Sequence, residues 1–188
     1  IRQTAEHLEA KIKYHLLAIT GTLNQYEGVA VRSRVKECES ALDALRRREE
    51  GATFDPDRLY SLTKLKDLAG VRVLAFPRSR LEEIDEALRL VFPAEFWTAN
   101  PVLGENSERL AFKYSGYCPT STKVLSEYQV VSMLTGLFWE IEHAAIYKPS
   151  PELRGLTRSP SMQARSRDVL NALGGFEDEF ERLLKRLT

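Results

Sequence analysis

Residues 66–76 read KDLAGVRVLAF, and this stretch decides the fold that we predict for the chain. Gly70 ends a polar segment, and the β-branched run VRVLAF that follows it is typical of a sheet strand. Arg72 lies inside this strand, and Asp67 comes just before it. An arginine in a half-buried strand is costly unless an anion compensates its charge. The stretch therefore predicts a strand that borders a charged site.

Helical and strand-like patterns alternate on both sides of this strand. Apolar residues at helical spacing and helix end signals predict helices over residues 4–23, 33–50, 55–70, 79–92, 136–148 and 162–187. We expect the last of these to be interrupted near Gly174–Gly175. Besides residues 71–76, strand-like runs cover residues 109–124 and 126–134. Helices alternating with three or four strands predict an α/β or α+β fold, in which helices pack on a mixed sheet.

Length, charge and cysteine content exclude several classes. A chain of 188 residues suits one domain with a real core. Its 27 basic and 27 acidic side chains cancel, so net charge gives no reason to expect a nucleic-acid or membrane partner. Cys38 and Cys118 have no zinc-type spacing, and no apolar run is long enough to span a membrane. We therefore expect a cytoplasmic protein. Since the chain begins with Ile1 rather than Met, we interpret it as part of something longer.

Polar side chains in three stretches carry the candidate chemistry. They are Asp67 with Arg72, Lys113 before Gly116–Tyr117, and Glu127 with Gln129. Glu127 and Gln129 share one face of their strand, because strand side chains repeat with period two. If this strand neighbours residues 71–76, the carboxylates of Asp67 and Glu127 converge at one end of a sheet. Two carboxylates with room between them suit Mg²⁺, which keeps sites free for substrate phosphates. Nearby basic side chains would then neutralise those phosphates, as phosphoryl transfer requires.

Five motifs in a fixed order resemble a known family. RVKECES, DLAGVRV, KYSGY, EYQVV and FWEIEHAAIYK follow one another between residues 34 and 148. Together they resemble the synthetase domain of RelA/SpoT-type (p)ppGpp synthetases, with the closest likeness to the small, single-domain alarmone synthetases. The resemblance implies a nucleotidyltransferase-like synthetase fold with helical extensions at both ends. It divides the single domain, residues 1–188, into N-terminal helices (1–50), a catalytic core (51–148) and a helical tail (149–188).

The resemblance also implies an activity and a role for each matching residue. The family transfers pyrophosphate from ATP to the 3′-hydroxyl of GDP or GTP with Mg²⁺, which makes this chain a GTP pyrophosphokinase. The implied metal ligands are Asp67 and Glu127, and the implied catalytic residues are Asp67, Glu127 and Gln129. The implied ATP-binding residues are Arg34, Lys36, Ser40, Arg46, Arg47 and Arg72. The implied acceptor-binding residues are Lys113, Tyr117, whose ring stacks on the acceptor base, and His143.

The sequence departs from the family pattern where the acceptor would be recognised. Cys118 and Ser121 stand where the family has an arginine and a histidine, Val131 replaces another arginine, and Ala44 replaces a lysine. Two further hypotheses follow from these changes. One is a toxic relative that uses adenine nucleotides or the 3′ end of tRNA as acceptor, with an antitoxin or immunity protein as partner. The other is a non-catalytic member that binds a nucleotide or a partner protein.

Simpler explanations exist for each candidate residue. Asp67 would then belong to a helix end, Arg72 would pair with a surface acid, and Tyr117 would pack at a rim. Glu127 and Gln129 would lie on the solvated face of an edge strand, and His143 would bond to a helix neighbour. The family resemblance further implies a homo-oligomer formed through the terminal helices, although an apolar stripe on a helix does not reveal its partner.

Overall fold

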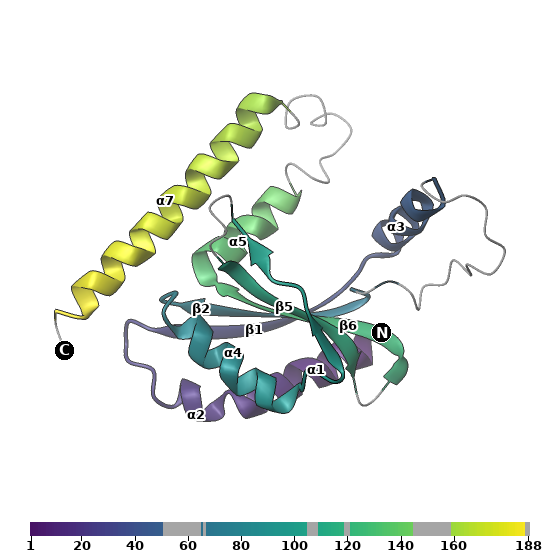
Figure 1. Ribbon diagram of the computed structural model, residues 1–188, viewed down its shortest axis with the longest axis horizontal. Helices are drawn as coiled ribbons and strands as arrows, with labels where there is room; N and C mark the ends of the chain where they lie inside the picture. The colour runs from purple at the N-terminus through teal and green to yellow at the C-terminus, as the bar shows by residue number, and fades with distance from the viewer. Residues whose placement is uncertain (51–64, 66, 105–108, 119–120, 145–158, 187–188) are drawn as a thin grey trace.

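A mixed six-stranded sheet lies between two layers of helices in the part of the chain that is described (Figure 1). The computed structural model describes residues 1–50, 65, 67–104, 109–118, 121–144 and 159–186, without the side chains of residues 47–50 and 121–123. The strands are β1 (Gly28–Val35), β2 (Ala69–Phe76), β3 (Trp97–Ala99), β4 (Val102–Leu103), β5 (Arg109–Cys118) and β6 (Ser121–Ser132). The predicted fold class, a mixed sheet flanked by helices, is confirmed.

The helices cover the sheet on both sides. On one side lie α1 (Arg2–His15), α2 (Leu17–Thr20) and α4 (Arg80–Val91), and on the other lie α5 (Met133–Glu142) and α7 (Pro160–Leu184) (Figure 1). The remaining described helix, α3 (Cys38–Glu50), projects from the end of the sheet to which β1 leads (Figure 1). In the described part of the chain, no helix is both long and apolar enough to cross a bilayer.

The strand order is β1-β2-β6-β5-β3, and β4 also pairs with β5. Every neighbouring pair is antiparallel except β2 and β6, which run parallel. In that parallel pair, Gly70 lies opposite Glu127 and Arg72 lies opposite Gln129. Residues 71–76 therefore lie beside the Glu127 strand, which is the arrangement that we considered as a condition for a shared site.

The main hydrophobic core fills the space between the sheet and the layer of α1 and α4. Its members are nearly inaccessible apolar side chains, among them Leu8, Ile12, Leu16, Ile84, Leu88, Val71, Val73, Tyr128 and Val130. Each large apolar side chain buried in this way contributes about 1.5–3 kcal/mol to folding. The core therefore fixes the sheet from one side and leaves its opposite face to carry polar groups.

Residues 28–35 form a strand, whereas we predicted a helix that begins at residue 33. β1 pairs with β2 from Gly28 to Val35, and α3 begins only at Cys38. The basic side chains in the second half of β1 look like a helix surface in the sequence, but they alternate with side chains that face the other way. The alternation becomes decisive only when β2 is known to lie alongside.

Three other boundaries differ from the prediction. β6 runs through Leu125 and Ser126 without a break, and it ends at Ser132, whose hydroxyl accepts a hydrogen bond from the backbone N–H of Thr135 and so caps α5. α7 continues through Gly174–Gly175. A single glycine costs a helix only about 1 kcal/mol, and packing of the long helix outweighs that cost. The helix expected over residues 55–70 falls mostly outside the described residues, as does the tail between residues 149 and 158.

Candidate active site

Charged side chains gather on the sheet face that α1 and α4 do not cover. The strand register aligns them in rows that cross the sheet. One row contains Arg34, Gly70, Glu127 and Ser115, and the next contains Arg32, Arg72, Gln129 and Lys113. A third row, Ala30, Leu74, Val131 and Ala111, is apolar and packs against α5. The same face therefore changes from apolar under α5 to charged toward the end where α3 leaves the sheet.

Glu127 is the centre of the charged rows. Although only 3 % of this residue is exposed, its carboxylate accepts hydrogen bonds from Lys113 Nζ at 2.7 Å and Gln129 Nε2 at 2.7 Å. Arg34 Nη2 lies 4.0 Å from it on the other side. Gly70 makes this approach possible, because a Cβ there would lie 3.3 Å from the Cγ and Nε of Arg34. The glycine in the opening motif thus lets an arginine of β1 reach across β2 toward β6.

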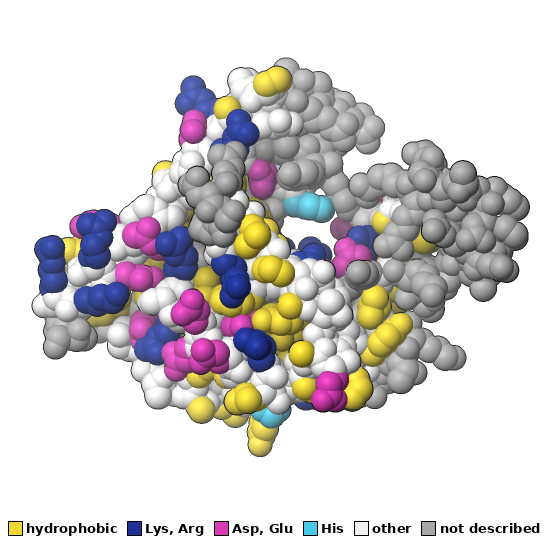
Figure 2. All heavy atoms as spheres, in the orientation of Figure 1, with side chains coloured by type: hydrophobic (Ala, Val, Ile, Leu, Met, Phe, Trp, Pro, Cys, Tyr) yellow, Lys and Arg dark blue, Asp and Glu magenta, His cyan; other side chains and the backbone are white. Residues whose placement is uncertain are grey.

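Asp67 lies at the entrance of β2 and pairs with Lys36. Lys36 Nζ donates to its carboxylate at 2.6 Å, and the backbone N–H of Lys36 donates to the carbonyl of Leu68 at 3.0 Å. Both residues line a cavity of about 540 Å³, together with Arg34, Ser40, Asp43 and His143. Figure 2 shows a hollow between α5 and α3 in which basic and acidic side chains face each other. Because Arg34 and Lys36 share this lining with the carboxylates of Glu37, Asp43 and Asp67, the cavity suits a polyanion only when it arrives with its own counterion.

Arg72 is held by α5. Its side chain is only 13 % exposed, and its Nη1 donates to the carbonyl of Gly136 at 3.2 Å and to Glu140 Oε1 at 3.3 Å. Burial, followed by the positive charge of Arg34, lowers the pKa of this guanidinium, while Glu140 and Glu127 oppose the change. Among the described residues, Nε has no hydrogen-bond partner. Glu140 of α5 is therefore the anion that we expected to compensate the charge of Arg72.

Sequence reasoning missed Glu140. Its signal in the sequence is its position one helical turn after Gly136, on the helix that directly follows the Glu127 strand. Gly136 on the same helix is also important, because a Cβ at this position would lie 2.3 Å from Leu74 Cδ2. The glycine thus lets α5 lie close to β2 and brings Glu140 to Arg72.

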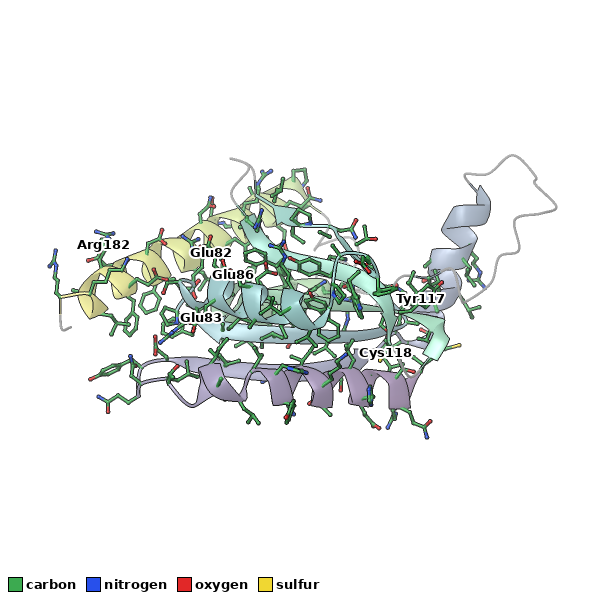
Figure 3. The ribbon with its side chains drawn as sticks, turned by 60° about the horizontal axis from the view of Figure 1, so that its bottom comes forward. Glu82, Glu83, Glu86, Tyr117, Cys118 and Arg182 are labelled. Atoms are coloured by element: carbon green, nitrogen blue, oxygen red, sulfur yellow. The ribbon has the colours of Figure 1, made fainter. Side chains whose placement is uncertain are left out.

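Tyr117 lies at the end of β5, opposite Leu125 (Figure 3). It is 48 % exposed, so its ring is available to a flat partner. Gly116 beside it is tightly enclosed, because a Cβ there would lie 2.4 Å from the carbonyl oxygen of Phe96. Cys118, the next residue, is fully buried. Tyr117 is therefore the exposed member of a segment that is otherwise packed.

The remaining predicted residues are placed unequally. Ser40 and His143 line the 540 Å³ cavity, but Arg46 does not. Arg46 pairs at 3.6 Å with Asp43, which does line the cavity, and both side chains are mostly exposed. The side chain of Arg47 lies outside the described part of the chain. Glu127, Gln129, Lys113 and Tyr117 lie on the sheet face next to this cavity rather than in its lining.

A second cavity, of about 890 Å³, lies between α4, β3 and β5. Its walls include Asp85 and Tyr114, whose hydroxyl donates to the Asp85 carboxylate at 2.7 Å. Burial raises the pKa of both groups. Of the residues predicted from sequence, only Lys113 borders this cavity. We therefore place the candidate site on the charged sheet face and in the smaller cavity.

Comparison with solved structures gives the fold its class: the chain has the fold of the small alarmone synthetases. The small alarmone synthetase 1 from Bacillus subtilis bound to its product pppGpp matches 99% of this chain and 93% of its own, with a TM-score of 0.69 and 19% identity. The same protein bound to AMPCPP matches over 98% and 92%, with a TM-score of 0.64 and 19% identity. A GTP pyrophosphokinase family protein from Streptococcus pneumoniae matches over 98% and 89%, with a TM-score of 0.68 and 16% identity.

At these identities the likeness shows the fold, and the predicted synthetase fold is confirmed. No family model matches the sequence. A search of curated proteins gives no match either. The charged rows and the shared fold together carry the functional proposal that follows.

Proposed function

We propose that this protein is a pyrophosphokinase that transfers pyrophosphate from ATP to the 3′-hydroxyl of GDP or GTP and releases AMP. The observation that carries the proposal is the position of Glu127, buried on the open sheet face and surrounded by Lys113, Gln129 and Arg34. The proposal is supported by the shared fold, since the Bacillus subtilis protein with this fold binds AMPCPP and the product pppGpp.

ATP would occupy the 540 Å³ cavity with its phosphates against Arg34, Lys36 and Ser40. These groups come from the end of β1 and the start of α3, so one short segment would grip the polyphosphate. Arg72, fixed by Gly136 and Glu140, would present its guanidinium from the neighbouring strand. Positioning and charge neutralisation would supply most of the rate acceleration, because phosphoryl transfer needs little covalent help from the protein.

Asp67 and Glu127 fit Mg²⁺ through the chemistry of their donors. Mg²⁺ is usually held by one or two carboxylates together with substrate phosphates and waters. In the described residues, no group of three or more His, Cys, Asp and Glu side chains gathers as a metal cage. Each carboxylate is instead paired with a lysine, Asp67 with Lys36 and Glu127 with Lys113. Bound Mg²⁺ would neutralise the phosphates, and the two lysines would be free to contact them.

The acceptor would lie over Tyr117, with its base stacked on the exposed ring. Its 3′-hydroxyl oxygen would attack the β-phosphorus of ATP, a new P–O bond would form, and the bond from the β-phosphorus to the α,β-bridging oxygen would break. AMP would leave with that oxygen. The hydroxyl proton would pass to the carboxylate of Glu127, which Gln129 Nε2 orients by its hydrogen bond at 2.7 Å.

A different acceptor is the second candidate function. Cys118 is fully buried and uncharged at the position where the family resemblance expects an arginine. The charge that would read a guanine nucleotide there is therefore missing. An adenine nucleotide or the 3′ end of tRNA would then be the acceptor, with an antitoxin or immunity protein as partner, while the transfer chemistry would stay the same.

The test is an assay of AMP release and of the second product by ion-exchange chromatography. The protein is incubated with Mg²⁺, labelled ATP and, in separate reactions, GDP, GTP, unlabelled ATP or tRNA. We expect label in a guanine nucleotide, and label in an adenine nucleotide or tRNA would select the second candidate. Binding of AMPCPP without AMP release for any acceptor would point to a non-catalytic nucleotide-binding protein.

Two variants test the mechanism itself. Asp67→Asn and Glu127→Gln should each lower AMP release by about 10²- to 10⁴-fold, because each removes a carboxylate needed for charge neutralisation or proton transfer. Glu82→Gln serves as control, since Glu82 is an exposed carboxylate on α4, away from Tyr117 (Figure 3). Undiminished turnover in both test variants would refute this mechanism.

A further inference from the structure

Arg32 is a basic residue of the charged face that the family motifs do not cover. It lies on β1 directly opposite Arg72 of β2. Like charges directly opposite each other destabilise an antiparallel pair of strands. The pair therefore needs a shared anion, and Glu140 supplies it. Its Oε2 lies 3.7 Å from Arg32 Nη1 and its Oε1 lies 3.3 Å from Arg72 Nη1.

Glu140 bridges Arg32 and Arg72, and the two arginine side chains differ in how firmly they are held. Arg72 is mostly buried and bonds to the carbonyl of Gly136 as well as to Glu140. The side chains of Arg32 and Glu140 are 57 % and 45 % exposed. Exposed ion pairs contribute little to stability, so the ion pair between Glu140 and Arg32 opens at little cost. Arg72 is thus fixed, whereas Arg32 is available to a better anion.

A phosphate group is such an anion. It carries more negative charge than a carboxylate, and its oxygens can accept two parallel hydrogen bonds from one guanidinium, whereas Glu140 lies 3.7 Å from Arg32. The placement also fits, because Arg32, Arg34 and Lys36 follow one another with period two and therefore share a side of the chain. Arg34 and Lys36 already line the 540 Å³ cavity. Arg32 adds a third basic side chain to this side of the chain, one position closer to α5.

We propose that Arg32 is a further phosphate-binding residue of this site, and that Glu140 is a positioning residue which holds Arg32 until a nucleotide polyphosphate displaces it. The identity of the ligand rests on the proposed function. Arg32 would restore part of the positive charge that is missing at Ala44, Cys118 and Val131. Glu140 would keep the opposed arginines from repelling each other while the site is empty.

Calorimetric titration of the 188-residue protein with AMPCPP and Mg²⁺ tests the proposal. Arg32→Gln should weaken binding about tenfold, because a charge-assisted hydrogen bond is lost. Glu140→Gln should strengthen binding about threefold, because glutamine still accepts from Arg72 but no longer competes for Arg32 with a negative charge. In the double variant the gain should disappear, and binding should equal that of Arg32→Gln alone.

The matched control is Arg182→Gln, which breaks an exposed arginine–glutamate pair on α7 far from the site (Figure 3). It should leave AMPCPP binding unchanged. Unaltered affinity in Arg32→Gln would overturn the proposal. So would a gain from Glu140→Gln that persists when Arg32 is absent, since that gain would reflect general electrostatics only.

The AMP-release assay on the same proteins separates this inference from the proposed function. Binding that follows the expected pattern without AMP release for any acceptor would overturn the proposed function and support the role of Arg32. Turnover in the wild type with unaltered AMPCPP affinity in Arg32→Gln would overturn the role of Arg32 alone. Failure of the wild-type protein to bind AMPCPP would overturn both.

Discussion

The two faces of the sheet differ in how specific their side-chain contacts are. On the face toward α1 and α4, one apolar side chain can replace another, because any apolar group that packs well fills the core. On the face toward α5, charged groups are held by specific polar partners, such as Lys36 for Asp67 or Glu140 for Arg72. The first face stabilises the fold, and the second face would carry the proposed chemistry. Adjacent residues of one strand, Tyr128 and Gln129, therefore serve different purposes.

The largest expected effect is on the free energy of unfolding, and it distinguishes Tyr128 from Gln129. Tyr128 is fully buried, and its ring lies 4.8 Å from that of Tyr114 and 5.0 Å from that of Phe92. Tyr128→Ala should lower the free energy of unfolding by about 3–5 kcal/mol, as truncation of a large core ring does. Gln129→Ala should change it by less than about 1 kcal/mol but reduce AMP release. Denaturant unfolding and the chromatographic assay measure the two effects.

Tyr128→Phe is the matched control for the first variant. The Tyr128 hydroxyl has no hydrogen-bond partner among the described residues. Its removal should therefore leave the free energy of unfolding unchanged or slightly higher. A loss as large as that of Tyr128→Ala would show that the hydroxyl, rather than ring packing, stabilises this face.

The next effect concerns the border between the faces at Gly116. A Cβ there would meet the Phe96 carbonyl at 2.4 Å and the Trp97 ring at 2.6 Å. Gly116→Ala should therefore cost about 1–3 kcal/mol of unfolding free energy. It should also weaken acceptor binding, because β3 must shift away from the strand that carries Tyr117. Thermal unfolding and the KM for the acceptor measure these losses.

Gly175→Ala on α7 is the control for added volume. A Cβ at Gly175 meets nothing within 4 Å. The substitution should stabilise the helix by about 0.5–1 kcal/mol, because alanine favours a helix more than glycine does. Equal destabilisation by the two alanine variants would contradict the packing argument for Gly116.

The smallest effect depends on pH and concerns the helix layer behind the charged face. Glu177 of α7 is fully buried, and Ser132 Oγ donates to its Oε2 at 2.6 Å. Burial raises its pKa above 4.5, although Ser132 and Arg78 oppose this and Asp178 and Glu181 add to it. The stability that protonation provides is full below pH 4.5 and is lost as the pH rises through the raised pKa.

Glu177→Gln removes this loss. The variant should unfold with nearly the same free energy as the wild type at pH 4, and should be more stable than the wild type at pH 8. Unfolding curves across this pH range measure the difference. A variant that is less stable than the wild type at pH 8 would show that the ionised carboxylate is itself a favourable partner of Arg78.

The sequence predicts the apolar face of the sheet and its helices better than the charged contacts. The run VRVLAF and the apolar faces of α1 and α4 are local patterns, so their structure follows from spacing alone. Within these helices, His15 follows the spacing of the apolar side chains Leu8 and Ile12 but is exposed. Likewise Ile141 of α5 is apolar but 66% exposed. Single positions at the ends of helices are decided by neighbours that the local pattern does not include.

The missed features share one physical reason. β1 was not predicted because its basic residues can be assigned to a strand only once β2 is known to lie beside them. Glu140 was not predicted because its partner Arg72 lies 68 positions away in the chain. The family resemblance named Arg34, Lys36, Asp67 and Glu127, and the register explains how Arg34 reaches Glu127 over Gly70. Contacts between distant segments require the register, which no local pattern contains.

The parallel pairing of β2 with β6 has a consequence for the order of folding. β5 and β6 are antiparallel and consecutive, so they form from nearby residues, whereas β2 must wait for α4, β3 and β5 before it meets its partner. Such high contact order makes this junction slow to form. During synthesis β1 and β2 are made first, but the strand that joins β2 to β5 is complete only once Ser132 has been added. The sheet, and with it the face that carries Glu127, therefore closes only after all of its strands have been made.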